Sequence, residues 1–140
     1  MNQNECARLG AYLSKLLGSP TVSVVPNGPE EGSVLVDGGA VAEVTKDEED
    51  GELSYCVSLL IPRAAGSKQG APIDEGERKR VEGVLKQKLH AAGVVVRPRP
   101  RKTDSAEVYV GDEFIGTISA DDDAGYFLTA IILGFDLEDE

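Results

Sequence analysis

The chain contains few of the residues from which common catalytic and binding sites are built. Its 140 residues include no tryptophan, one histidine and two cysteines, and aromatic residues make up 5%. Cys6 and Cys56 lack the paired spacing of a zinc site or a disulfide framework, so we expect two reduced, partly buried thiols. A Gly-rich phosphate loop and a Gly-Lys-Ser/Thr sequence are both missing, which disfavours a nucleotide hydrolase.

Long hydrophobic runs and an excess of basic residues are also lacking. Every apolar stretch is well short of the roughly 20 residues that a membrane-spanning helix needs. The first five residues lack the basic flank and apolar run of a secretory signal. The net charge of -11 argues against nonspecific binding to nucleic acid or to an anionic membrane. We therefore expect a cytoplasmic protein without membrane contact.

The sequence offers little for catalysis. His90 is expected in the last turn of a helix, where an imidazole complements the negative end of the helix dipole. No nucleophile or orienting acid accompanies it in a recognisable motif, and no base is visible in the sequence beside Cys6 or Cys56. We expect no enzyme, no catalytic residue and no cofactor. An enzyme of unknown class, acting through His90 or a carboxylate pair across two halves of the chain, is the last of three hypotheses.

What the chain does contain is an internal repeat. In the first half, apolar residues at helical spacing from Leu9 to Leu17 precede Gly18 and a short β segment ending at Pro26. The second half has the same order: apolar residues at helical spacing within 81–89, then Gly93, then a β segment that ends at Pro98. Such self-similarity is the signature of a repeat architecture.

The repeat continues beyond the prolines after a two-residue insertion in the second copy. The predicted equivalences pair Val34 with Val108, Val36 with Val110, residues 47–49 with 121–123, Leu53 with Phe127, Val57 with Ile131, and Leu59 with Leu133. Between the copies, residues 63–73 have the Pro, Gly, Ser and Ala composition of a linker.

These patterns predict an α+β fold made of a tandem pseudo-symmetric repeat. Each unit is a helix followed by an antiparallel β-meander of three to four strands, over residues 1–62 and 74–140. Asp74 and Glu77 resemble the start of a helix, with Gly93 as its left-handed end. Glycines at 38 and 111 suit tight hairpins.

The last strand of the second copy, from Phe127 to Phe135, is apolar on both faces, so it needs cover on both. We expect one face to meet the helix and the other to meet the sister copy or a second chain. The two copies are therefore predicted to pack as one compact body, either as a monomeric pseudo-dimer or as a homodimer.

The second copy also resembles a known family. It contains Arg97-Pro98-Arg99-Pro100-Arg101-Lys102, then residues 104–116 with Gly-Asp-Glu-Phe-Ile-Gly, then an acidic turn and Ala130-Ile131-Ile132-Leu133. These segments are similar to those of a family of small, single-copy alphaproteobacterial proteins classed only as a domain of unknown function. The first copy lacks the arginine-rich and Gly-Asp-Glu-Phe-Ile-Gly segments. The resemblance implies a fold unit and a bacterial cytoplasm, and it brings no reaction, cofactor or catalytic residue.

Charge is segregated along the second copy. Nine basic residues lie between Arg78 and Lys102 with only Glu82 opposing them, whereas residues 103–140 contain none. The strip Arg97, Arg99, Arg101 and Lys102 could bind phosphate or nucleic acid, or it could neutralise the acidic hairpins of its own fold or of a neighbour. We favour neutralisation, because the chain is acidic and has few aromatic residues for base stacking.

The acidic turn Asp121-Asp122-Asp123 is a weak candidate for a metal site. Calcium takes several carboxylate oxygens, but a calcium loop spaces its ligands alternately and adds a later glutamate, and neither feature is present. We expect solvated turn residues, since Asp before Gly is common in turns. The same holds for residues 47–50.

Three hypotheses for function follow from these observations. The first is a non-catalytic protein-interaction or assembly module that presents Arg97 to Lys102 and the Tyr109 strand to a protein partner. The second is an RNA- or DNA-binding accessory protein that uses the same basic strip. The third is the enzyme of unknown class described above.

Overall fold

The computed structural model describes residues 1–49, 51–62, 73–99, 102–121, 125–134 and 137. The elements in chain order are α1 (Gln3–Leu17), β1 (Val22–Pro26), β2 (Glu31–Val36), β3 (Gly39–Glu49), β4 (Glu52–Pro62), α2 (Glu75–Leu89), β5 (Val94–Arg99), β6 (Lys102–Val110), β7 (Glu113–Asp121) and β8 (Gly125–Leu133). Each half is thus one helix followed by four antiparallel strands, which confirms the predicted α+β repeat. No described helix is long and apolar enough to cross a membrane.

Both helices begin at capping residues that the sequence supplies. In α1 the Asn2 side chain accepts a hydrogen bond from the Glu5 N–H at 2.7 Å, and the Glu5 carboxylate accepts one from the Asn2 N–H at 3.1 Å. In α2 the Asp74 carboxylate accepts a hydrogen bond from the Glu77 N–H at 2.8 Å. Such caps satisfy N–H groups that have no partner inside the helix.

The end of α2 differs from the prediction. Gly18 ends α1 in the left-handed conformation, with φ of 66°, but the equivalent residue of α2 is His90, with φ of 51°, and not Gly93. Gly93 lies in the turn just before β5, where its carbonyl accepts a hydrogen bond from the Gly111 N–H at 2.9 Å, next to the first β5–β6 pair. The helix therefore ends before the glycine is reached.

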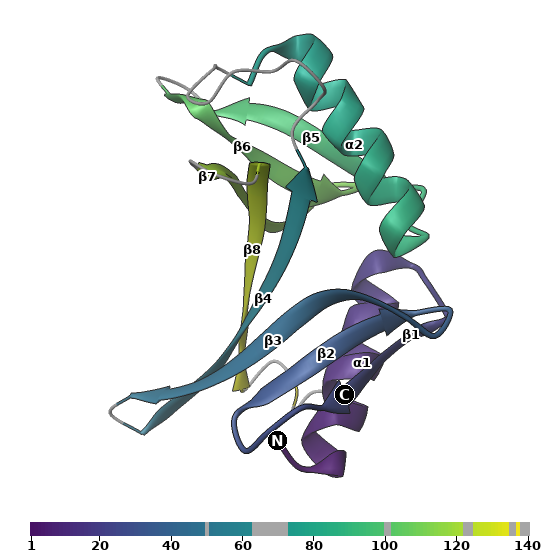
Figure 1. The fold of residues 1–140 in the computed structure, drawn as a ribbon, viewed down its shortest axis with the longest axis vertical. Coiled ribbons are helices and arrows are strands. Elements are labelled where there is room, and N and C mark those ends of the chain that lie inside the picture. The colour runs from purple at the N-terminus through teal and green to yellow at the C-terminus, as the bar shows by residue number, and fades with distance from the viewer. Residues whose placement is uncertain (50, 63–72, 100–101, 122–124, 135–136, 138–140) are drawn as a thin grey trace.

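The eight strands form one antiparallel sheet in the order β1-β2-β3-β4-β8-β7-β6-β5 (Figure 1). Each copy contributes a meander, and the meanders join through the pairing of β4 with β8. Both helices lie on the same face of this sheet (Figure 1). The edge strands β1 and β5 contain the equivalent prolines Pro26 and Pro98. Proline cannot donate to a ladder, so it discourages further strands from adding at either edge.

The register of the β4–β8 pairing is symmetric about a pseudo-two-fold axis. Tyr55 pairs with Ile132, and the reciprocal pair is Ile61 with Tyr126. The axis passes at the pair of Ser58 with Thr129, midway between those two pairs. The interface between the copies is therefore isologous, with the same strand of each copy facing its equivalent, as in a two-fold symmetric dimer.

The predicted register of the last strand is wrong by three residues. Val44 pairs with Val57, thirteen positions on, but its equivalent Ile118 pairs with Leu128, only ten positions on, so the second hairpin is three residues shorter. Val57 thus corresponds to Leu128 and not to Ile131. An odd shift moves every side chain of a strand to the opposite face, and indeed Val57 is buried whereas Ile131 is exposed.

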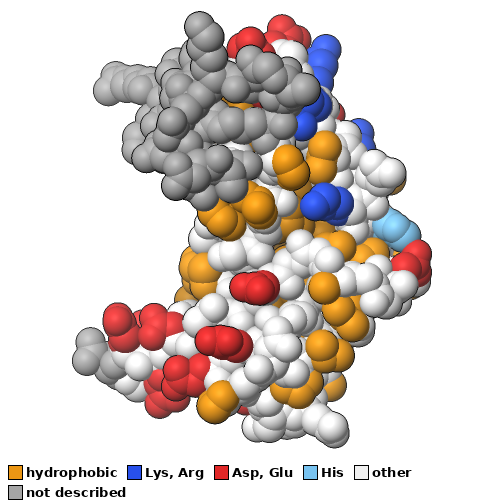
Figure 2. Space-filling model, in the orientation of Figure 1, with side chains coloured by type: hydrophobic (Ala, Val, Ile, Leu, Met, Phe, Trp, Pro, Cys, Tyr) orange, Lys and Arg blue, Asp and Glu red, His pale blue; other side chains and the backbone are white. Residues whose placement is uncertain are grey.

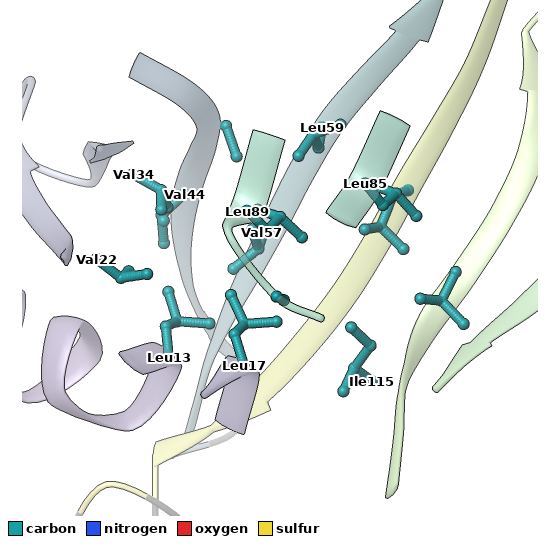
Figure 3. Packing of buried hydrophobic residues seen from close by; sticks show 14 of the residues in the cluster. Leu13, Leu17, Val22, Val34, Val44, Val57, Leu59, Leu85, Leu89 and Ile115 are labelled. Atoms are coloured by element: carbon teal, nitrogen blue, oxygen red, sulfur yellow. The ribbon is translucent and has the colours of Figure 1, made fainter. Parts of the chain in front are cut away.

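A single core lies between the helices and the sheet. Leu13 and Leu17 of α1 approach Val57 and Leu59 of β4, and Leu89 of α2 joins the same cluster (Figure 3). Complete burial of a leucine side chain contributes about 2 to 3 kcal/mol. The two helices therefore share one hydrophobic core across the seam between the copies.

The expected cover on the second face of β8 is not supplied by the sister copy. The sister copy meets β8 along its edge, through β4, instead of stacking on its face. Edge pairing satisfies backbone groups of both strands but leaves the side chains that point away from the helices uncovered. This face, which we call the open face, is described below.

Close packing between β7 and β8 and open space beside α2 predict opposite effects for two glycine substitutions. A Cβ atom at Gly116 of β7 would lie 2.5 Å from the Thr129 backbone oxygen of β8, whereas one at Gly83 of α2 would meet nothing within 4 Å. We expect Gly116→Ala to lower the free energy of unfolding by about 1 to 3 kcal/mol. Gly83→Ala should raise it by about 0.5 to 1 kcal/mol, because alanine is the better helix former. Urea denaturation measures both, and equal or higher stability of Gly116→Ala would contradict the packing.

Candidate functional site

The exposed large hydrophobic side chains among the described residues gather on the open face. They are Val25 (39% exposed), Leu60 (39%), Phe114 (51%), Phe127 (37%), Ile131 (59%) and Leu133 (41%). Those of β8 alternate with buried Tyr126, Leu128 and Ile132, which face the helices. Strand alternation therefore places them on the side that no described element covers.

Five of these side chains form what we call the open-face patch: Leu60, Phe114, Phe127, Ile131 and Leu133. Leu60 and Phe127 are direct partners across the β4–β8 seam. Phe114 lies on β7, beyond the pair of Thr117 with Thr129, toward the end of the sheet where Ile131 and Leu133 lie. Hydrophobic side chains are visible where the molecular outline is hollowed (Figure 2). The patch therefore spans three neighbouring strands.

The first copy provides an internal comparison for this patch. Across the repeat, Phe127 corresponds to Cys56, Phe114 to Ala40, and Ile131 to Leu60. The residues facing the helices keep the same character, as in Tyr55 and Tyr126. The same unit thus folds with a cysteine and an alanine where the second copy exposes two phenylalanines. The aromatic side chains of the patch are not needed for the fold.

Two of the predicted binding residues border the patch. The Arg97 guanidinium carbon lies 4.3 Å from the centre of the Tyr109 ring. Tyr109 meets Phe114 edge to face, with ring centres 5.5 Å apart. Its hydroxyl donates a hydrogen bond to the Glu107 carboxylate at 3.3 Å. Stacking of this kind fixes the guanidinium above the sheet and leaves it exposed.

The remainder of the predicted basic strip is only partly described. Arg99 is half-buried and donates a hydrogen bond to the Ser105 hydroxyl at 3.3 Å. Lys102 begins β6, but its side chain lies outside the described part, and Arg101 lies outside the described residues altogether. The structure thus brings Arg97 and Tyr109 together beside Phe114, a residue that the sequence analysis did not single out.

The structure also places the other residues considered for chemistry. His90 Nδ1 lies 3.3 Å from the Asp37 carboxylate of the first copy. Cys6 and Cys56 are free thiols, the former buried, and burial raises the pKa of the Cys6 thiol. The metal candidates Asp122 and Asp123 lie outside the described residues, and so does the side chain of Asp121, which ends β7. Within the described residues, no cluster of three metal-binding side chains occurs.

A tyrosine and a glutamate anchor each helix to the seam. The Tyr55 hydroxyl of β4 donates a hydrogen bond to the Glu5 carboxylate of α1 at 2.7 Å. The equivalent pair is Tyr126 of β8 and Glu77 of α2, at 2.9 Å. In copy one, Lys46 adds an ion pair to Glu5 at 2.8 Å. In copy two the cation is Arg80 of α2 itself, which pairs with Glu77.

These contacts determine the protonation of the first anchor. Burial by itself would raise the pKa of Glu5, but hydrogen bonds from Lys46, Tyr55 and the Asn2 backbone outweigh it and lower the pKa to about 2. The hydrogen bond to Glu5 raises the pKa of Lys46. Burial and the same carboxylate raise the pKa of Tyr55. The charged form of Glu5 is thus the one that holds α1 against the sheet.

A cavity of about 590 Å³ adjoins this anchor. It lies between the first turns of α1, the start of β4 after the hairpin turn and the end of β8, and its lining includes Glu5, Arg8, Tyr55 and Leu137. The Glu5 carboxylate is already occupied by Lys46, Tyr55 and Asn2. A carboxylate with a pKa of about 2 is a poor general base near neutral pH, because the best base has a pKa close to the working pH.

A shallower groove of about 360 Å³ lies on the open face. Apolar side chains of Val41, Leu60 and Phe127 line it together with the Ser58 hydroxyl and the Glu43 carboxylate. Glu43 and Ser58 are paired neighbours on β3 and β4. Further carboxylates continue along the same hairpin, which is visible as an acidic projection (Figure 2). The groove is therefore apolar at the seam and acidic on the first-copy side.

Fold and surface together define a pseudo-symmetric α+β protein whose sheet is covered by helices on one face and uncovered by any described element on the other. The chain belongs to the family described as "Protein of unknown function (DUF3126)", whose sequence model matches residues 5–63 and again residues 77–133. Each match covers most of one helix and its meander, which confirms the resemblance and the duplication. Comparisons with curated proteins and with solved structures found no match.

The Glu5 anchor predicts part of the acid sensitivity of the fold. Because the folded pKa of about 2 lies below the usual 4.5, ionised Glu5 stabilises the folded state above pH 4.5, and this contribution is lost as the pH falls toward about 2. The free energy of unfolding should therefore differ between pH 4.5 and about pH 2, and we expect Glu5→Gln to reduce that difference by about 1 to 3 kcal/mol. Urea denaturation across this pH range measures it. Glu75→Gln, on an exposed carboxylate of α2, is the matched control, and equal pH slopes for wild type and Glu5→Gln would refute the assignment.

Proposed function

We propose that this chain is a non-catalytic protein-interaction module that binds a partner protein through the open-face patch. The observation that carries the proposal is the difference between the two copies. The second copy exposes Phe114 and Phe127 where the first has Ala40 and Cys56, although both copies have the same fold. Exposed aromatic side chains that the fold does not require favour a binding role.

The surroundings of the patch support the same role. Arginine and aromatic residues are enriched where proteins bind one another, because they combine large contact area with directional hydrogen bonds. Arg97, stacked on Tyr109, places an arginine and an aromatic ring beside Phe114. The proposal thereby extends the hypothesis of a partner-binding edge at Arg97 to Lys102 from the edge strand onto the open face.

Nucleic-acid binding is the weaker alternative. It would use the same guanidinium groups, but phosphate recognition is driven by neutralising many backbone charges. Arg99 is engaged with Ser105, and exposed carboxylates of Glu43 and Asp47 lie on the same face. The acidic half of the face would repel a phosphate backbone, whereas a protein partner can match both halves.

The proposal predicts that capture of a partner depends on Ile131. The tagged chain is expressed in the organism from which the sequence comes. The proteins that it captures are identified by mass spectrometry for the wild type, Ile131→Lys and Arg97→Glu. We expect a specific protein that Ile131→Lys abolishes, since a charge on the most exposed patch residue cannot be buried without a partner. Arg97→Glu should reduce its capture.

Val25→Lys is the matched control, because Val25 is an exposed apolar residue of the open face that lies on the edge strand β1, away from the patch. This variant should retain the captured protein. Circular dichroism and thermal melting verify that each variant is folded. Identical captured proteins for wild type and Ile131→Lys would overturn the proposed function.

A further inference from the structure

We infer that the partner contributes a segment that carries both apolar and basic side chains, seated in the groove at the β4–β8 seam. This inference rests on the proposed function and specifies the chemistry of its partner. It follows from the way apolar and acidic side chains are juxtaposed along the groove.

The floor of the groove fits apolar side chains. Leu60 and Phe127 are partners across the seam, and Val41 lies beside them on β3. Leu60 and Phe127 are more than a third exposed, although both flank buried residues of the core. Covering them removes apolar surface from water at roughly 25 cal/mol per Å², which gives the interaction its main favourable term.

The rim of the groove fits basic side chains. Glu43 lines the groove itself, and the open face of copy one carries further exposed carboxylates along β2 and the β3–β4 hairpin, those of Glu31, Asp47, Glu49 and Glu52. Within the described part of the chain, none of these carboxylates forms an ion pair. Charge that is not neutralised inside the fold attracts an oppositely charged partner and excludes like-charged ones. Lysine or arginine beside the apolar residues of the partner is therefore the complementary arrangement.

A second copy of this chain fits the groove less well. Each chain carries a net charge of -11, so two copies repel each other at long range. Facing sheets could place Arg97 and Arg99 of one copy near the acidic half of the other, but among the side chains that the structure describes these two cations are outnumbered by the five open-face carboxylates. A basic segment of another protein matches the rim without this repulsion.

The test uses three fluorescein-labelled peptides of equal length and the full chain. The first alternates leucine and lysine, the second alternates leucine and glutamate, and the third alternates serine and lysine. Fluorescence anisotropy measures their affinities at low and at physiological ionic strength. We expect the leucine–lysine peptide to bind at both ionic strengths. The other two peptides should bind at least about tenfold more weakly, because one lacks the basic side chains and the other lacks the apolar side chains.

Matched variants of the chain separate groove binding from general attraction to an acidic protein. Leu60→Ser should weaken the leucine–lysine peptide by about tenfold, whereas Val25→Ser, at the same 39% exposure, should not. Glu43→Gln should weaken it by about two- to fivefold. Glu75→Gln, which changes the net charge equally on an exposed part of α2, should not. Thermal melting verifies that each variant is folded.

Three outcomes would overturn the inference. Equal effects of Glu43→Gln and Glu75→Gln would mean nonspecific attraction, and tighter binding of the leucine–glutamate peptide would mean that the partner is acidic. The third outcome is a dimer in sedimentation analysis that Leu60→Ser dissociates. Such a dimer would make a second copy of the chain the occupant of the groove and would overturn the inference. Any of these results leaves the Ile131-dependent capture untouched, so failure here is distinguishable from failure of the proposed function.

Discussion

The pairing of β4 with β8 holds the two copies together in one sheet. A helix and four strands bury little surface alone, and the fourth strand of each unit would be left with unpaired N–H and C=O groups. Pairing the two fourth strands removes both edges and joins the cores, so that Leu17 and Leu89 pack in one cluster. The remaining edges are β1 and β5, and each contains a proline.

The same pairing explains how the helices are held. Each seam strand provides a tyrosine whose hydroxyl reaches a glutamate in the first turn of its own helix, in Tyr55–Glu5 and Tyr126–Glu77. The cation that pairs with this glutamate differs between the copies: it is a lysine of β3 in copy one and an arginine of α2 in copy two. The geometry of the anchor is thus retained while the surrounding charges differ, which is expected where only the buried hydrogen bond is needed for packing.

Duplication also separates what the fold requires from what it does not. On the face toward the helices most equivalent residues are alike, as in Tyr55 and Tyr126, because close packing tolerates little change in volume. On the open face they differ, with aromatic and guanidinium groups in the second copy and carboxylates and small residues in the first. Because both copies lie in one sheet, the acidic and apolar regions meet at the seam and together form the groove. A homodimer of identical units could not place different chemistry on its two halves.

The repeat, the α+β class, the start of α2 at Asp74 and the Gly111 hairpin could all be predicted from the amino-acid sequence, because helical spacing, capping and turn chemistry are local. The sequence also indicated that β8 is apolar on both faces. The register of that strand could not be predicted, since a hairpin three residues shorter leaves the apolar pattern intact while exchanging its faces. The exposure of Ile131, the edge-on pairing of the sister copy with β8, and the position of Phe114 beside Arg97 and Tyr109 are evident only in the folded structure. These features depend on pairing between residues distant in the chain, which no local pattern specifies.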